Sequence, residues 1–338
     1  MDGYNVAVVG ATGAVGEAMM EILEKRKFPV NNVFPLASER SAGSRLQFNG
    51  KSLVVQDLST FDFSQAQIGL FSAGGSVSEY YAPKAAAAGC VVIDNTSHFR
   101  RDDDIPLVVP EVNAVRVKDY SDRNIIANPN CSTIQMLVAL KPIYDAVGIS
   151  RINVSTYQAV SGSGKRGVEE LAHQTARLLN ANPIETDVFP KQIGFNAIPH
   201  IGDFQDNGFT LEEMKMIWET QKIFEDDEIQ VNPTCVRIPV FYGHSEAVHI
   251  ETREKITARK AAQLLKEFPG IKVIDEWVDG GYPTAVSDSA GTDSVFVGRI
   301  REDLHLDTGL DLWVVSDNVR KGAALNSIQI AEVLIKHL

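Results

Sequence analysis

The chain has 338 residues, of which 44% are hydrophobic, and a formal net charge of −12. It contains no apolar run of about 18 residues, so we expect no membrane span, and no long Lys/Arg cluster, which argues against nucleic-acid binding. Three cysteines cannot form a disulfide framework. Their odd number and the lack of a signal-peptide pattern at the N-terminus predict a cytoplasmic protein.

The first part of the chain alternates apolar runs with helical patterns. The apolar runs lie at 4–10, 32–38, 52–58, 68–74 and 90–96, and the helical patterns at 14–28 and 76–89. Such alternation predicts a parallel sheet covered by helices. The runs are continuously apolar, as expected of strands buried on both faces. The fold predicted here is α/β, with a Rossmann-type sheet.

The glycines at the end of the first run predict a phosphate-binding turn. Gly10, Gly13 and Gly16 follow a strand and open a helix, which is the context that dinucleotide binding requires. Glycines let the main chain approach a pyrophosphate, and the helix start supplies N–H groups. An ordinary tight turn is the alternative.

The end of the second predicted strand bears on the choice between NAD and NADP. Sites that prefer NAD usually carry an acidic residue there. Here Glu39 is acidic, but Arg40 and Ser41 follow it. An arginine can pair with a 2′-phosphate, which favours NADP. The alternative for Arg40 is a solvated surface charge.

Cys131 stands in "NPNCST", just before a helical run at 133–143. A thiol at a helix start is favoured as the thiolate, which is the nucleophilic form. The alternative is a buried structural cysteine. Cys90 and Cys235 lie in apolar strands and are predicted to be structural.

The sequence changes character after about residue 150. Longer, partly alternating runs at 151–160, 234–242, 244–256, 294–302 and 310–318 predict a mixed or antiparallel sheet, with helices at 168–180 and 211–224. A last helical stretch at 323–338 can pack back on the first domain. We therefore expect a first domain over 1–130, to which a helix of about 321–338 returns, and a second domain over 131–320.

A catalytic thiol needs a base, and His244 is the candidate, since it follows a glycine at the mouth of a strand. His249 would point to the opposite face, so the two histidines do not suggest a metal site, and no metal is expected. Arg237, in an otherwise apolar strand, requires an anionic partner, either a structural carboxylate or a substrate.

Together these segments resemble aspartate-semialdehyde dehydrogenases. The similar segments are "GATGAVG", "ASERSAG", "DNTSHFR", "PLVVPEVN", "NPNCST", "QAVSGSG", "EEMKMIWET", "RIPVFYGH" and "VSDNVRKGAA", in that order from residue 10 to about 324. The resemblance implies a fold like that of glyceraldehyde-3-phosphate dehydrogenase, with a Rossmann domain and an α+β catalytic and dimerisation domain.

The resemblance also implies an activity, which is the NADPH-dependent reduction of L-aspartyl 4-phosphate to L-aspartate 4-semialdehyde and phosphate. This reaction leads toward lysine, threonine, methionine and diaminopimelate. The resemblance implies at least a homodimer, with a tetramer as the alternative. The partners expected are small-molecule substrates, with neither nucleic acid nor membrane.

The resemblance also implies roles for individual residues that lie in the similar segments. It implies that Cys131 is the nucleophile, His244 the acid/base and Gln158 the residue that orients the acyl group. Arg237 would bind the substrate carboxylate, Glu212 the amine, and Arg100 and Lys215 the phosphate. The implied cofactor-binding residues are Gly10, Thr12, Gly13, Ala14, Val15, Ser38, Arg40, Ser41, Ser161, Gly162 and Asn318. The helical pattern alone would make Glu212 and Lys215 solvated surface residues.

Three alternatives remain. N-acetyl-gamma-glutamyl-phosphate reductases share the chemistry, but an acylated amine needs no carboxylate partner, so Glu212 favours a free amino acid. A thiol hydrolase would use Cys131 and His244 but would need no glycine turn. A nucleotide-binding regulator would leave both residues unexplained.

Overall fold

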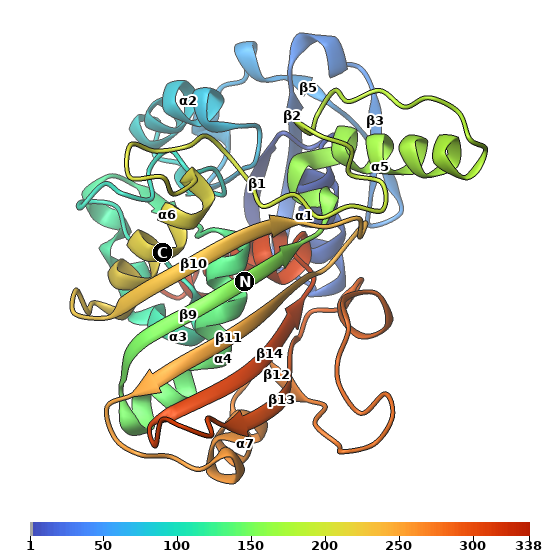
Figure 1. The fold of residues 1–338 in the computed structure, drawn as a ribbon. Helices are drawn as coiled ribbons and strands as arrows, with labels where there is room; N and C mark the ends of the chain where they lie inside the picture. The colour runs from blue at the N-terminus through green and yellow to red at the C-terminus, as the bar shows by residue number, and fades with distance from the viewer. Residues whose placement is uncertain (1–2) are drawn as a thin grey trace. The chain divides into compact units, whose positions relative to one another are not determined.

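The structure is a computed structural model that describes residues 3–338, and its chain forms two compact units. The first unit comprises the described residues up to Pro129 together with Ala323–Leu338, and the second comprises Asn130–Gly322. Figure 1 shows both units coloured along the chain. The predicted first domain begins at residue 1, so its first two residues lie outside the described range.

The first unit is built on a parallel six-stranded sheet with strand order β5-β2-β1-β6-β7-β8. Its strands are β1 (Tyr4–Val9), β2 (Val30–Ala37), β5 (Gln56–Asp57), β6 (Ile68–Phe71), β7 (Val91–Asp94) and β8 (Ile125–Ala127). All residues of β6 and β7 are buried, as their continuous apolar runs predict. The parallel sheet is as predicted.

The run at 52–58 does not form one strand of this sheet. Residues Lys51–Val54 form β4, which pairs with β3 (Arg45–Phe48) as a separate antiparallel hairpin, and only β5 joins the parallel sheet. Three of the four residues of β4 are exposed. A strand in the middle of the parallel sheet would have to bury both of its faces, and this segment does not.

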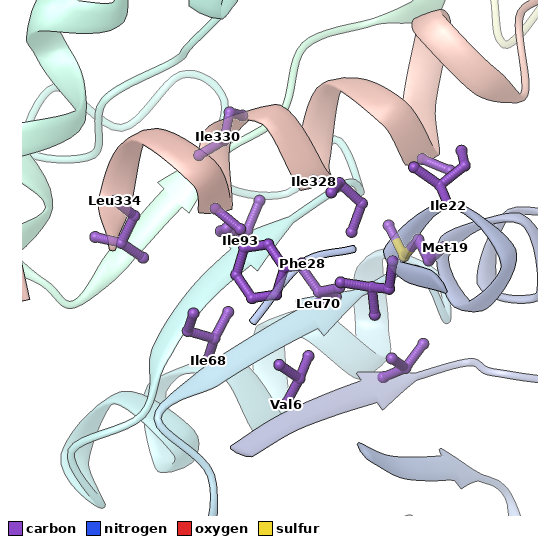
Figure 2. Packing of buried hydrophobic residues seen from close by; sticks show 14 of the residues in the cluster. Val6, Met19, Ile22, Phe28, Ile68, Leu70, Ile93, Ile328, Ile330 and Leu334 are labelled. Atoms are coloured by element: carbon purple, nitrogen blue, oxygen red, sulfur yellow. The ribbon is translucent and has the colours of Figure 1, made fainter. Parts of the chain in front are cut away.

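Helices α1 (Ala14–Lys25) and α8 (Leu325–Leu334) form the core of the first unit with β1, β6 and β7. Met19, Ile22 and Leu23 recur at helical spacing and are buried. Figure 2 shows Met19 and Ile22 near Ile328 of α8. Each fully buried side chain of this size stabilises the unit by roughly 1.5–3 kcal/mol. The unit also contains α2 (Gly75–Ala87), α3 (Pro110–Asn113) and several short 3-10 turns.

The second unit is built on a mixed six-stranded sheet with order β10-β9-β11-β14-β13-β12. Its strands are β9 (Ile149–Gln158), β10 (Gln230–Arg237), β11 (His244–Thr252), β12 (Ile271–Val273), β13 (Val295–Glu302) and β14 (Gly309–Ser316). The pairs β9–β10 and β12–β13 are parallel and the rest antiparallel, which confirms the predicted mixed sheet.

Helix α4 (Cys131–Val147) packs on one face of this sheet, against β9, β11, β13 and β14. Burial therefore alternates along β9, whose buried residues face the helix. Helix α6 (Leu211–Phe224) packs on both α4 and β10. Helices α5 (Gly164–Leu179) and α7 (Ala258–Glu267) complete the unit (Figure 1). Within residues 3–338, no helix has the length and apolarity to cross a membrane.

Candidate active site

Cys131 is the first residue of α4 and is half-buried. Asn130 caps the helix, since its side-chain oxygen accepts hydrogen bonds from the amides of Ser132 (3.0 Å) and Thr133 (3.3 Å). Asparagine is among the preferred residues at this position. The cap fixes the direction of the first turn and therefore the place of the thiol.

Two carboxylates of α6 accept hydrogen bonds from the capping residue, Asn130. The side-chain amide of Asn130 donates to Glu212 (2.7 Å), and its main-chain amide donates to Glu219 (2.6 Å). Helix α6 is itself fixed by a reciprocal capping box between Thr210 and Glu213. The helix that carries the thiol is thus tied to α6 at its first residues.

Glu212 is buried, not solvated as its helical pattern suggests. Burial acts to raise the pKa of its carboxyl, but Lys215 at 3.0 Å, the Asn130 hydrogen bond and Arg237 outweigh burial and hold the pKa at about 2. The half-buried Lys215 therefore faces an ionised carboxylate inside the unit. The helical pattern alone did not predict this burial.

Three polar residues meet at the ends of adjacent strands. Gln158 ends β9 and pairs directly with Arg237, which ends β10. His244 begins β11, whose register pairs Ser245 with Tyr157 and so places His244 beside Gln158. The Gln158 side chain donates to the Ser132 hydroxyl (2.7 Å) in the first turn of α4. The predicted Cys131, Gln158, Arg237 and His244 are thus gathered within one unit.

Arg237 is only 5% exposed. Its guanidinium donates to the carbonyl oxygen of Ala159 (2.6 Å). Burial lowers its pKa, whereas Glu212 and Cys131 act to raise it. A buried guanidinium remains charged and requires anionic partners, so it can hold a carboxylate that enters beside Glu212.

His244 is fully buried, and its Nδ1 accepts a hydrogen bond from the main-chain amide of Ala159 (3.0 Å). Burial, and then Arg237, lower its pKa from 6.5 to about 3, against an opposing effect of Glu212. These effects favour the neutral form of the imidazole.

Three of the residues predicted to bind the cofactor, Ser161, Gly162 and Asn318, also lie in the second unit. Ser161 and Asn318 exchange hydrogen bonds of 3.2 and 3.0 Å, and the Asn318 oxygen accepts from the amide of Gly243 (2.9 Å). Gly162 is exposed, and a Cβ there would lie 2.8 Å from the Arg237 guanidinium. Its lack of a side chain keeps the space in front of Arg237 open.

The other predicted cofactor residues lie in the first unit, at the carboxyl end of the parallel sheet. Strand β1 has β2 on one side and β6 on the other, so this edge is a topological switch point, where such folds bind dinucleotides. Gly10 has a φ of +85°, and a Cβ on Gly16 would lie 2.2 Å from the Gly10 oxygen. No side chain caps α1 at Gly13, which leaves its first N–H groups for a ligand. This tight, uncapped turn fits a dinucleotide pyrophosphate.

The remaining members of this group surround the turn and the end of β2. Thr12, Ala14, Val15 and Ser41 are half-buried, and Gly13, Ser38 and Arg40 are exposed. Arg100, also in this unit, is buried and donates to the Asn95 carbonyl (3.0 Å).

Several supporting residues were not predicted from the sequence. Asn130 could have been found, because "NPNCST" places it one residue before a helix. Ser132, Glu219 and Gly322 carry no such signal, since their contacts join segments far apart in the chain. A Cβ added to Gly322 would lie 2.7 Å from the Cβ of Cys131.

The fold and the strand-end site define an oxidoreductase of the semialdehyde dehydrogenase class. The family described as "Semialdehyde dehydrogenase, NAD binding domain" matches residues 5–120, and "Semialdehyde dehydrogenase, dimerisation domain" matches residues 140–321. The chain belongs to the aspartate-semialdehyde dehydrogenase family.

Curated relatives and solved structures support this assignment. The chain is 64% identical to the aspartate-semialdehyde dehydrogenase of Shewanella violacea over 98% of both chains. A crystal structure of aspartate semialdehyde dehydrogenase II from Vibrio cholerae, complexed with ASA, has a TM-score of 0.98 at 61% identity over 99% of both chains. A Candida albicans enzyme with NADP has a TM-score of 0.73 at 27% identity over 98% of both chains. The predicted family, fold class, enzyme class and NADP cofactor are confirmed.

Proposed function

We propose that the chain reduces L-aspartyl 4-phosphate with NADPH to L-aspartate 4-semialdehyde and phosphate, through a thioester on Cys131. The reaction serves the synthesis of lysine, threonine, methionine and diaminopimelate. The observation that carries the proposal is the position of Cys131 at the start of α4, with Gln158, Arg237 and His244 at the adjacent strand ends.

Direct reduction of an acyl phosphate is difficult, and a thiolate divides it into two easier steps. The sulfur of Cys131 attacks the acyl carbon and phosphate leaves, which gives a thioester. NADPH supplies the hydride that reduces this thioester to the aldehyde. Gln158 orients the acyl group, and its hydrogen bond to Ser132 holds its side chain in place.

The residues proposed to hold NADP belong to both units. Gly10, Thr12, Gly13, Ala14 and Val15 form the phosphate turn, and Ser38, Arg40 and Ser41 follow β2, where Arg40 pairs with the 2′-phosphate. Ser161, Gly162 and Asn318 are the members from the second unit. The tight, uncapped turn at α1 and the exposed Arg40 support this role.

The charges of the site suit a substrate with a carboxylate, an ammonium group and a phosphate. Arg237 offers a planar fork to the carboxylate. Glu212 is ionised and buried and therefore favours a cationic amine. Arg100 and Lys215 supply the positive charges for the phosphate. An N-acetylated substrate would leave Glu212 without that cation, which disfavours the N-acetyl-gamma-glutamyl-phosphate reductase alternative.

We further propose two domains over 1–130 and 131–320, with a helix of about 321–338 that belongs to the first. A homodimer forms through the second domain, and a tetramer is the larger alternative. The match of a dimerisation domain to residues 140–321 supports this assembly. A cytoplasmic location is supported by the three cysteines, none of which forms a disulfide.

The test is Cys131→Ala beside Cys90→Ala as the matched control. The first variant should lose phosphate-dependent formation of NADPH from the semialdehyde and still bind NADP. The control should keep both properties, since Cys90 is fully buried beside Gly69 of β6 in the first unit. Full turnover by Cys131→Ala would exclude the thioester route.

A further inference from the structure

The segment that carries Arg100 has no regular secondary structure of its own. It follows β7 directly, and none of the described residues 95–100 belongs to a helix or a strand. The main-chain amides of such a segment have no helical or strand partner, so side chains or water must supply their hydrogen bonds. Since Arg100 is proposed to bind the phosphate, the groups that order this segment also set the direction of its guanidinium.

Asp94, the last residue of β7, supplies part of these hydrogen bonds and is completely buried. Its Oδ1 accepts from the main-chain amide of Thr96 (3.1 Å), and its Oδ2 accepts from the Thr96 hydroxyl (2.7 Å). The Thr96 hydroxyl in turn accepts from the main-chain amide of His98 (3.3 Å). One carboxylate and one hydroxyl therefore pair two of the main-chain amides between β7 and Arg100.

Asp94 and the segment after it are also held by neighbouring elements of the first unit. The hydroxyl of Ser78, which is buried in α2, donates to Oδ1 of Asp94 (2.7 Å). The main-chain amide of Asn95 donates to the carbonyl oxygen of Phe71 on β6 (2.8 Å), and the side chain of Phe99 is buried. The segment is thus anchored at both of its ends.

The start of this segment contacts Arg100 directly. The Arg100 guanidinium donates to the carbonyl oxygen of Asn95, the residue next to Asp94 (3.0 Å). Burial raises the pKa of the Asp94 carboxyl, whereas its hydrogen bonds from Ser78 and Thr96, and then the charge of Arg100, act to lower it. Arg100 therefore lies within electrostatic range of Asp94 as well.

We propose, resting on the function proposed above, that Asp94 is a positioning residue for Arg100 in phosphate binding. Because Asp94 is completely buried, it acts through the shape of residues 95–100 and not on the substrate. This action is geometric, so it requires the two hydrogen-bonding atoms of the carboxylate but not its negative charge. A negative charge beside Arg100 would by itself repel the phosphate.

The first test compares Thr96→Val with Thr96→Ser. Valine replaces the hydroxyl by a methyl group of similar size, so it removes the bond to Asp94 and the acceptor for His98, whereas serine keeps both. In the phosphate-dependent oxidation of the semialdehyde, Thr96→Val should raise the KM for inorganic phosphate about 10-fold or more, because Arg100 is displaced. Thr96→Ser should stay within about 2-fold of the wild type, and the KM for the semialdehyde should change by less than about 2-fold in both variants.

The matched control is Ser78→Ala, which removes one hydrogen bond from the same buried carboxylate but from α2, outside the segment. It should lower the free energy of unfolding about as much as Thr96→Val does and leave the KM for phosphate unchanged. An equal rise of this KM in Ser78→Ala and Thr96→Val would show a general loss of stability and overturn the proposal. An unchanged KM for phosphate in Thr96→Val would also overturn it.

A second pair of variants separates geometry from charge. The amide oxygen of Asp94→Asn can accept from Ser78 and from the Thr96 amide, and its NH₂ group can donate to the Thr96 hydroxyl. This variant should keep the wild-type KM for phosphate or lower it, whereas Asp94→Ala should raise it as Thr96→Val does. A rise in Asp94→Asn as large as that in Asp94→Ala would contradict a geometric role.

Hydrogen exchange distinguishes this inference from the proposed function. The amides of Thr96 and His98, followed in the peptide that spans β7 and Arg100, should exchange faster in Thr96→Val than in the wild type and Thr96→Ser. Unchanged exchange in Thr96→Val would contradict the inference whether or not the enzyme turns over. A wild type that forms no NADPH from semialdehyde, phosphate and NADP would instead contradict the proposed function.

Discussion

Gly322 lies directly against Cys131, since a Cβ added to the glycine would lie 2.7 Å from the cysteine Cβ and 3.2 Å from its Cα. Gly322 stands in the π-helical turn Arg320–Ala324, and real Cβ atoms essentially never approach this closely. The atoms that this added Cβ would meet are the Cβ and main-chain atoms of Cys131, which cannot move away by rotation of the side chain. This glycine therefore sets the position of the thiol.

The first prediction concerns Gly322→Ala. Because a misplacement of about 1 Å in a reacting group can cost about 10²-fold in rate, we expect kcat to fall between about 10-fold and 100-fold. The affinity for NADP should change little. Steady-state kinetics and a cofactor titration check this, and a variant with wild-type kcat would show that α4 tolerates the displacement.

The second prediction concerns Glu246, which is fully buried on β11. Burial raises its pKa well above 4.5, and the nearby Gln135 and Ser132 side chains only partly offset this. The folded state then binds a proton that the unfolded state releases, so stability falls as the pH rises above about 4.5. Glu246→Gln should remove this loss.

We therefore expect Glu246→Gln to raise the free energy of unfolding by about 1–3 kcal/mol at neutral pH, and by almost nothing below about pH 4. Urea unfolding across this range measures the difference. The exposed Glu254→Gln serves as the control and should show no such trend. An advantage for Glu246→Gln that does not depend on pH would contradict a neutral buried acid.

The third prediction concerns Arg237, whose fork-shaped guanidinium is proposed to hold the substrate carboxylate. Arg237→Lys keeps the charge but loses the bidentate geometry, so KM should rise about 10-fold or more. Arg237→Leu should weaken binding by about 2–5 kcal/mol, because the carboxylate loses its charged partner. The exposed Arg116→Leu, which breaks a surface ion pair with Asp119, is the control. Unchanged KM and kcat in Arg237→Leu would remove this role.

The sequence predicted the parts of the fold that depend on local pattern. Continuous apolar runs such as Ile68–Phe71 and Val91–Asp94 are fully buried parallel strands. The hairpin of β3 and β4 was not predicted, because a short half-polar run such as Lys51–Val54 does not reveal its pairing partner. Pairing depends on contacts between distant segments.

In the site, too, features that depend on local sequence could be predicted, whereas those that depend on packing could not. Cys131 could be placed at a helix start from "NPNCST" alone. The burial of Glu212 could not be read from α6, because it follows from α4 packing against that helix. The lowered pKa of His244 was also unpredictable, since it depends on complete burial and on Arg237 from another strand. Burial and electrostatics of this kind are properties of the packed unit.

The central claim is that Cys131 carries the aspartyl group as a thioester, and peptide mass spectrometry tests it most directly. The protein is mixed with L-aspartyl 4-phosphate without NADPH, quenched in acid and digested. The account predicts one added aspartyl group, on the peptide that contains Cys131, present in Cys90→Ala and absent from Cys131→Ala. A folded, active protein that shows no adduct, or carries it on Cys90 or Cys235, would contradict the account.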